Sequence, residues 1–305
     1  MKDRGRLLVF GKNGQIGQAF SEILSRNRSD NVYLLGSQDC RVEKTDELER
    51  VLERIRPQLI VNCAAYTAVD KAETESDLAM SINTEAPGVM ARWCAQNRAK
   101  LIHFSTDYVF NGNLDRPYLE QDPTGPLGAY GQSKLMGEKL IRQHLKAHLI
   151  FRISWVFSCV GNNFVKTMLR LGSERESLKI VSDQIGSPTF APDVARAVLK
   201  VVGIDGEKVS DTEFPFGTYH LHNLGETTWF EFAQSIFAVA KSLGVALKVK
   251  EILPTTTAEF GAPAPRPLNS RMNMDLFSQT FGIDMPSWEQ SLNSCITTLQ
   301  KNSLL

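Results

Sequence analysis

The most informative segment of the chain reads Gly11-Lys12-Asn13-Gly14-Gln15-Ile16-Gly17 and directly follows the apolar run 6–10. Glycines at this spacing are typical of the turn between the first strand and the first helix of a dinucleotide-binding fold. Gly11 permits the tight turn, Gly14 lets the backbone approach a pyrophosphate, and Gly17 lets the helix pack on the strand. The free amide groups at the helix N-terminus would bind the phosphates. We therefore predict a cofactor site here that includes Gly11, Asn13, Gly14 and Gly17.

Short apolar runs alternate with helical patterns through the first half of the chain. The predicted strands are 6–10, 32–35, 58–63, 100–104 and 148–155, and the predicted helices are 15–26, 44–54, 83–97 and 130–145. Continuous apolar strands that alternate with helices are typical of a parallel sheet covered on both faces. We expect an α/β fold with a doubly wound, Rossmann-like parallel sheet, and we place an NADP-binding domain in residues 1–155.

The second half of the chain has a less regular pattern. Helical patterns at 163–171, 193–201 and 228–242 are separated by loops rich in Pro, Gly and Thr. The prolines of segment 254–267 predict that it is mostly loop. We expect residues 156–305 to form mainly a smaller α+β substrate-binding lobe, with some segments returning to the first domain.

Bulk composition excludes several classes of protein. Lys+Arg and Asp+Glu both total 34 in the 305 residues, and a net charge of zero argues against a nucleic-acid-binding protein. The apolar runs are far shorter than the roughly 20 residues of a membrane span, and the first residues lack the apolar segment of a secretory signal. The five cysteines include no CxxC pair, which favours reduced thiols over a zinc site. We therefore expect a cytoplasmic protein that binds neither nucleic acid nor membrane.

The end of the second predicted strand bears on the choice of cofactor. NAD-selective proteins usually place an Asp or Glu there, but this chain reads Leu35-Gly36-Ser37-Gln38 and has no carboxylate before Asp39. Ser37 and Arg41 could accept the 2′-phosphate of NADPH, which an acidic residue would repel. An ordinary solvated loop with a surface arginine explains the same residues equally well, so both interpretations stay open.

Two motifs carry the candidate chemistry, Ser105-Thr106-Asp107 at the end of a predicted strand and Tyr130-Gly131-Gln132-Ser133-Lys134 at the start of a predicted helix. Residues four apart share one face of a helix, so Tyr130 and Lys134 can point at one site. A nearby ammonium lowers the pKa of a phenol, which is ordinarily about 10, and makes the phenol a usable acid. A tyrosine and lysine at this spacing usually belong to a surface helix. Here the glycine turn and Thr106, which can bond a substrate carbonyl, favour catalysis.

These segments and several others resemble the dTDP-4-dehydrorhamnose reductase family, within the extended short-chain dehydrogenases/reductases. The resemblance covers nearly the whole chain, and its other motifs are Val61-Asn62-Cys63-Ala64-Ala65-Tyr66-Thr67-Ala68-Val69-Asp70-Lys71-Ala72-Glu73, Arg152-Ile153-Ser154-Trp155-Val156-Phe157, Gly161-Asn162-Asn163-Phe164, Asp183-Gln184-Ile185-Gly186-Ser187-Pro188-Thr189 and Arg266-Pro267-Leu268-Asn269-Ser270-Arg271. It implies an NADPH-dependent oxidoreductase that reduces the C4 keto group of dTDP-4-dehydro-L-rhamnose, or of a close 4-keto-6-deoxy sugar nucleotide, to dTDP-L-rhamnose. Such a sugar serves cell-surface polysaccharide biosynthesis.

The resemblance also implies roles for individual residues, and it assigns catalysis to Tyr130, Lys134 and Thr106. The implied cofactor contacts are Gly14, Gln15 and Ile16 at the pyrophosphate, Arg41 and Val42 at the adenine, Ala65, Tyr66 and Thr67 at the ribose, and Tyr130 and Lys134 at the nicotinamide. The implied substrate contacts are Thr106, Asp107 and Trp155 at the sugar, and Asn163 and Arg266 at the diphosphate. Trp155 could instead be an ordinary core residue.

Two features depart from the family pattern. Some members bind a magnesium ion at a dimer contact through glutamates, where this chain has Ala19, Pro192 and Leu299. Because a hard dication requires charged oxygen ligands, we expect no metal site and a monomer or weak homodimer. The family's usual Asp after the second strand is Arg41 here, which favours NADPH and leaves NADH possible.

Two rival functions share this fold. A sugar-nucleotide dehydratase typically has an Asp-Glu pair after the threonine, but Asp107 is followed by Tyr108 in this chain. A non-catalytic, NADP-binding regulatory subunit would not need Thr106, Tyr130 and Lys134, which are all present. A simple reductase therefore fits better than a dehydratase, a 4-epimerase or a regulatory subunit.

Overall fold

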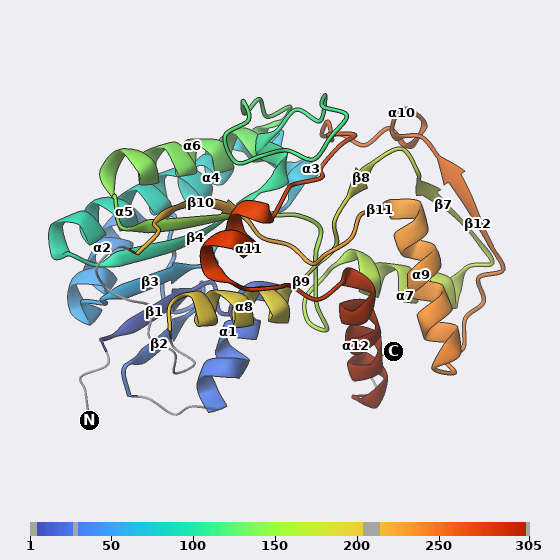
Figure 1. The fold of residues 1–305 in the computed structure, drawn as a ribbon, viewed down its shortest axis with the longest axis horizontal. Helices are drawn as coiled ribbons and strands as arrows, with labels where there is room; N and C mark the ends of the chain where they lie inside the picture. The colour runs from blue at the N-terminus through green and yellow to red at the C-terminus, as the bar shows by residue number, and fades with distance from the viewer. Residues whose placement is uncertain (1–4, 27–29, 204–213, 303–305) are drawn as a thin grey trace.

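The computed structural model describes residues 5–26, 30–203 and 214–302. Within these residues, six parallel strands form the main sheet in the order β10-β5-β4-β3-β1-β2 (Figure 1). The strands are β1 Leu7–Phe10, β2 Val32–Leu35, β3 Leu59–Asn62, β4 Lys100–Thr106, β5 His148–Ile153 and β10 Gly217–His220. The predicted α/β, Rossmann-like fold is confirmed. The strand order reverses between β1 and β3, which is where a doubly wound sheet opens a crevice at its carboxyl edge.

Side-chain alternation along each strand supplies both faces of the sheet. Leu7 packs into one core cluster and Leu8 into another, because successive residues of a strand point to opposite faces. Helices cover both clusters, and Figure 1 shows them on opposite sides of the sheet. One face carries α1 Gln15–Arg26 and α8 Ala191–Val201, and the other carries α2 Thr45–Ile55, α5 Ala86–Asn97 and α6 Ala129–His144.

A second lobe has its own apolar core, formed between three helices and a two-stranded parallel sheet. The helices are α7 Phe164–Glu174, α9 Trp229–Ser242 and α12 Trp288–Lys301, and the strands are β7 Ser177–Val181 and β12 Glu251–Thr255. Two short strand pairs lie near the junction of the lobes, β6 Val156–Phe157 with β9 Thr189–Phe190 and β8 Ile185–Gly186 with β11 Thr227–Thr228. The remaining short elements are α3 Val69–Ala72, α4 Ser76–Met80, a π-helix Ser81–Glu85, a 3₁₀ turn Asp107–Val109, α10 Thr257–Phe260 and α11 Asp275–Phe281.

Several segments beyond residue 155 complete the first lobe. Strand β10 pairs with β5 at the sheet edge, α8 packs on α1, and Phe277 of α11 lies in the cluster beneath the sheet. The chain therefore passes between the lobes more than once.

Local boundaries differ from the sequence expectations in two places. The strand predicted over 148–155 ends at Ile153, because Trp155 adopts a left-handed backbone with φ of 45°. The segment 254–267 is mostly loop as predicted, except that β12 extends to Thr255 and a short helix follows. That helix forms because Thr256 and Glu259 make a reciprocal capping box. In the described ranges, every helix is too short or too polar to cross a bilayer.

Candidate active site

The glycine turn joins β1 to α1 and is shaped by two steric requirements. Gly11 has φ of 80°, and a Cβ there would lie 2.6 Å from the Ala64 amide nitrogen. A Cβ on Gly17 would lie 2.0 Å from the Gly11 carbonyl oxygen, so the helix packs directly on the turn. At Gly14 the nearest atom is 3.5 Å away, which is ordinary contact. The protein itself would therefore tolerate a side chain at Gly14, and the open space beside it suits a close ligand.

A cleft of about 650 Å³ opens at the carboxyl ends of the strands beside this turn. It brings together most of the predicted site residues, namely Asn13, Gly14, Gln15, Ile16, Ala65, Thr67, Thr106, Asp107, Tyr130, Lys134 and Trp155. Further lining residues were not predicted as contacts, among them Asn62, Cys63, Ser105, Tyr108, Asn162 and Trp229. The local motifs of the sequence thus converge on one cavity.

Tyr130 begins α6 and faces the end of β4. Thr106 hydrogen-bonds the phenol, and its Oγ1 also donates to Asp107 Oδ1 at 2.9 Å. Burial raises the pKa of Tyr130 to about 12, while the Thr106 hydrogen bond acts in the opposite direction. The net lowering of the Tyr130 pKa that the sequence predicted is therefore wrong for the described site, because desolvation dominates. The phenol is fully protonated at neutral pH, as a proton donor must be.

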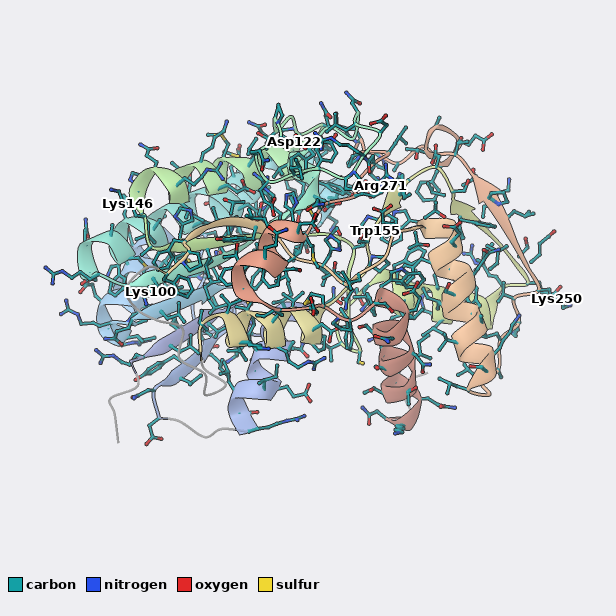
Figure 2. All side chains as sticks on the ribbon, in the orientation of Figure 1. Lys100, Asp122, Lys146, Trp155, Lys250 and Arg271 are labelled. Carbon is teal, nitrogen blue, oxygen red and sulfur yellow. The ribbon has the colours of Figure 1, made fainter. Side chains whose placement is uncertain are left out.

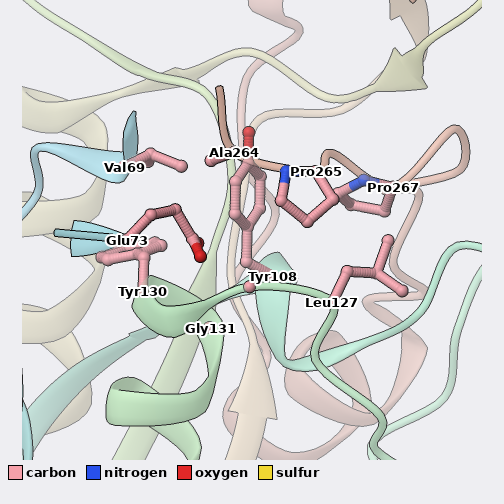
Figure 3. Close-up of a pocket in the computed structure, with 10 residues that line it drawn as sticks. Val69, Glu73, Tyr108, Leu127, Tyr130, Gly131, Ala264, Pro265 and Pro267 are labelled. Carbon is pink, nitrogen blue, oxygen red and sulfur yellow. The ribbon is translucent and has the colours of Figure 1, made fainter. Parts of the chain in front are cut away.

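The start of α6 is anchored from outside the helix. Glu73 Oε1 accepts a hydrogen bond from the Ala129 amide at 2.8 Å, which satisfies one free donor of the first turn. Figure 3 shows Tyr108 standing between Glu73 and Pro265, with Tyr130 beside it. The two tyrosine rings meet edge to face at 5.7 Å. This packing fixes where the Tyr130 ring points.

Lys134 is buried beneath the cleft, where it is 2 % exposed. Its Nζ donates to the Phe104 carbonyl oxygen at 2.5 Å and lies 3.2 Å from His103 Nε2. Burial lowers the pKa of Lys134 to about 8. The lysine is thus poised to change charge near neutral pH.

His103 and Asn62 support Lys134 and were missed by sequence reasoning. They are partners across the β3–β4 pairing, and Asn62 Nδ2 lies 3.1 Å from His103 Nδ1. Asn62 Oδ1 already accepts the Ala64 amide, so its Nδ2 is the group that faces the ring. A neutral imidazole has one acceptor nitrogen, whereas the Asn62 amide and the Lys134 ammonium both present donors to the ring, so only one of the two contacts can be a hydrogen bond to the ring at a time. Burial and the Lys134 charge keep the pKa of His103 well below its usual value.

Asp107 offers an acceptor inside the cleft. It is 3 % exposed, it accepts from Thr106 at Oδ1, and the Ser270 hydroxyl lies close enough to lower its pKa. Burial raises its pKa to about 6. Thr106 and Asp107 therefore form a buried, hydrogen-bonded pair at the lining of the cleft.

Trp155 lies between the two lobes (Figure 2). Its ring stacks on Trp229 with centroids 3.6 Å apart and an interplanar angle of 11°. Gly186 gives the ring room, since a Cβ there would lie 2.7 Å from the indole. Trp155 is a partly buried wall of the cleft rather than a core residue, and Trp229 borders a second cavity as well.

The second cavity has a volume of about 780 Å³ and lies against α7 and β7. Its lining combines aromatic rings, such as Phe164 and Phe260, with the cations Arg175, Lys179 and Arg266. Among the described residues that line it there is no carboxylate. The cavity therefore suits an anionic ligand that carries a flat ring.

Two predicted diphosphate contacts lie in different surroundings. Arg266 lines the second cavity and is held by Asp70, whose two oxygens lie 3.0 Å from one guanidinium nitrogen. Asn163 instead caps α7 by accepting the Lys166 amide, and its Nδ2 donates to Gln15 Oε1 at 3.0 Å. The Asn163 side chain thus braces the glycine turn.

Four predicted cofactor contacts, Ser37, Arg41, Val42 and Tyr66, are not among the described residues that line the cleft. Arg41 is paired with Glu47 at 3.1 Å, Ser37 is exposed, and Val42 is buried against the sheet. Tyr66 donates from its hydroxyl to Glu75 at 2.7 Å.

One carboxylate does reach the end of β2. Asp39 accepts the Gly36 amide at 2.8 Å and pairs with Lys12 at 2.6 Å. The argument from a missing carboxylate is corrected here, because the chain folds Asp39 back onto the loop.

Asn83 is a further supporting residue that sequence reasoning missed. It lies in the π-helix, accepts the Tyr66 amide at 2.9 Å and donates to Ser133 Oγ of α6 at 3.0 Å. It therefore joins the loop at the predicted ribose site to the helix of Tyr130 and Lys134.

Comparisons with known proteins agree with this geometry. Residues 5–301 match the family model described as RmlD substrate binding domain. The chain is 40 % identical over 298 residues to the dTDP-4-dehydrorhamnose reductase of Escherichia coli (strain K12), covering 96 % of this chain and 98 % of that protein. It is 38 % identical to the Burkholderia thailandensis protein of the same name, over 96 % and 99 % of the two chains. A crystal structure of the Bacillus anthracis dTDP-4-dehydrorhamnose reductase in complex with NADP is 38 % identical, with a TM-score of 0.87 over 96 % and 99 % of the two chains.

Proposed function

Since this chain belongs to the dTDP-4-dehydrorhamnose reductase family, we propose that it reduces the C4 keto group of dTDP-4-dehydro-L-rhamnose to give dTDP-L-rhamnose. It is an NADP-dependent oxidoreductase of dTDP-rhamnose biosynthesis, and its substrate is a dTDP-sugar. The observation that carries the site assignment is the meeting of Thr106, Tyr130 and Lys134 with the glycine turn in one cleft.

The residues around the glycine turn fit a dinucleotide. The first turn of α1 carries no acidic side chain, and a ligand can approach Gly14 closely. We assign the pyrophosphate to Asn13–Ile16, where free amide groups favour an anion, and the nicotinamide end to the cleft between Ala65 and Tyr130. NADPH, when bound, supplies the hydride for the carbonyl carbon.

The chain's own residues supply the proton. Tyr130 donates its phenolic proton to the C4 oxygen. The Thr106 hydroxyl, which donates to Asp107 Oδ1 in the structure, rotates and donates to the same C4 oxygen when substrate binds. The phenolate that remains is stabilised by the positive charge of Lys134. Asp107 lines the cleft beside Thr106 at the sugar, and the Trp155 ring provides a flat apolar surface for the deoxy sugar.

The second cavity is the candidate site for the nucleotide part of the substrate. Arg175, Lys179 and Arg266 provide positive charge for the diphosphate, and the aromatic rings accept the base. Trp229 borders both cavities, so a dTDP-sugar placed across it would present its sugar to Tyr130.

The proposal also covers the domains, the cellular location and the assembly of the protein. Residues 1–155 form the cofactor-binding domain and residues 156–305 mainly the substrate lobe. The protein works in the cytoplasm, as a monomer or weak homodimer without a metal. This assembly follows from the buried apolar side chains of Ala19 and Leu299 and from Pro192, none of which can bind a cation.

The decisive experiment gives the protein dTDP-4-dehydro-L-rhamnose and NADPH. We expect NADPH oxidation coupled to formation of dTDP-L-rhamnose, with the C4 configuration read from the proton couplings of the purified product. A product with the opposite C4 configuration would reject the rhamnose assignment and retain the reductase. A folded protein that binds NADPH but oxidises none would reject the reductase assignment itself.

A further inference from the structure

Two of the five cysteines meet in the second lobe, at a place that the reductase chemistry does not use. Cys159 lies in the loop between β6 and α7, and Cys295 lies in α12. Their sulfur atoms are 3.6 Å apart although they are 136 residues apart in sequence. The Cys159 thiol also approaches the Cys295 carbonyl oxygen at 3.5 Å.

The surroundings give the two thiols different reactivity. Cys159 is partly exposed, whereas Cys295 is fully buried. The contact with the Cys295 thiol lowers the pKa of Cys159, with help from Thr298 and against burial and the charge of Glu22. The same contact raises the pKa of Cys295, despite the nearby charge of Lys166. Because Cys159 is the partly exposed thiol and Cys295 is buried, Cys159 is the sulfur that an oxidant meets first.

We propose that Cys159 and Cys295 form a reversible disulfide when the protein meets a peroxide, and that this modification weakens cofactor binding. The Cys159 thiolate attacks one peroxide oxygen, the O–O bond breaks, and a sulfenic acid and hydroxide form. The hydroxide takes up the proton that Cys159 released. Cys295 then displaces the sulfenic hydroxyl, which leaves as water with the Cys295 proton. Two thiols are oxidised and one peroxide is reduced to two waters, and a dithiol reverses the bond.

The link to the cofactor follows from what the loop holds. Ser158 donates to Gln15 Oε1 at 2.9 Å and Asn163 Nδ2 donates to the same oxygen at 3.0 Å. Gly161 and Asn162 of this loop line the main cleft. Gln15 opens α1, where we place the pyrophosphate. The loop around Cys159 is thus the support of the proposed phosphate site.

Forming the bond requires movement. A disulfide has a sulfur–sulfur distance of about 2.05 Å, so the two atoms must approach by roughly 1.5 Å. Cys295 is held in a helix inside an apolar core, and Cys159 belongs to a loop. The loop therefore makes most of the movement, toward α12, and its hydrogen bonds to Gln15 lengthen.

The first test counts thiols and does not depend on the enzymatic activity. The full chain is treated with hydrogen peroxide, denatured and alkylated, and its intact mass and peptides are measured. We expect five alkylated cysteines in the reduced protein, three after oxidation, and one linked peptide joining Cys159 to Cys295. Oxidation that leaves five free thiols, or that stops at a Cys159 acid without the linked peptide, overturns the proposal.

The second test measures NADPH affinity by fluorescence for the oxidised and reduced protein. Weakening the hydrogen bonds to Gln15 predicts a Kd for NADPH about three- to tenfold higher after oxidation, restored by dithiothreitol. Cys159→Ser and Cys295→Ala should each abolish this shift, and either variant suffices if the other folds poorly. Cys63 lines the main cleft and is the competing target. The proposal fails if peroxide still raises the Kd for NADPH in Cys159→Ser and no longer raises it in Cys63→Ser. That result would assign the effect to Cys63.

Discussion

Replacing Tyr130 by Phe removes one hydroxyl from the cleft and tests the proton donor directly. The phenol is protonated in the structure, because burial raises its pKa to about 12, and Thr106 is the side chain bonded to it. General acid catalysis by a placed side chain is worth about 10²–10⁴ in rate, or roughly 3–5 kcal/mol of barrier. We expect kcat for reduction of the 4-keto sugar nucleotide to fall by that factor. The Kd for NADPH should stay within about twofold.

Tyr108 offers a matched control for this experiment. It lies edge to face with Tyr130 at 5.7 Å, and its hydroxyl bonds Arg266 at the second cavity. Tyr108→Phe should therefore raise the KM for the sugar nucleotide and spare kcat. Each variant loses one hydrogen bond, which costs about 1 kcal/mol of folding free energy, so both should stay folded. A kcat for Tyr130→Phe within about threefold of the parent, or an equal loss in Tyr108→Phe, would refute the assignment of the acid.

Four further predictions concern charge, cofactor choice and assembly. Burial lowers the pKa of Lys134 to about 8, so its ammonium is present below that pH and lost above it. The kcat for reduction should therefore fall as the pH rises through about 8. A constant kcat across that range would contradict the role of the charge. His103→Asn replaces the imidazole beside the lysine by an amide whose Oδ1 can accept from the ammonium, and it should move this alkaline limb to higher pH. Arg41→Asp should reduce the preference for NADPH over NADH in kcat/KM, whereas Arg41→Lys should retain it. If the preference is unchanged in Arg41→Asp, Arg41 binds only Glu47 and does not contact the cofactor. Removing divalent cations with EDTA should change neither activity nor sedimentation, and a dimer that dissociates under chelation would disprove the metal-free assembly.

The sequence predicted those parts of the site whose geometry is local. The glycine turn follows one strand and opens one helix, and Tyr130 and Lys134 share one helical face. Such relations are set by chain spacing alone, so the residues could be assigned correctly to one cleft. Strands β1 to β4 were also predicted at the correct places, because each is an apolar run that ends in a turn signal.

What the sequence could not predict depends on contacts between distant segments. Asn62 and His103 meet only because β3 pairs with β4 in one register, although a histidine inside an apolar strand was a usable signal. Strand β10 joins the main sheet from the far half of the chain, in a stretch without a strong pattern. The raised pKa of Tyr130 reflects burial, which spacing does not reveal. Arg175 and Lys179 face a cavity that exists only after the second lobe has folded.

The two cavities meet at Trp229, which stacks on Trp155, so a ligand that fills both cavities binds at two places at once. In the proposed placement, a dTDP-sugar engages the first lobe with its sugar and the second lobe with its nucleotide, so occupancy of one cavity raises the effective concentration of the other half of the ligand. Each half on its own forfeits that advantage. A free deoxy sugar therefore binds poorly however well it fits beside Tyr130, whereas the nucleoside diphosphate alone occupies its own cavity and competes with the whole substrate. The covalent linkage within the substrate, and not either half by itself, sets the affinity.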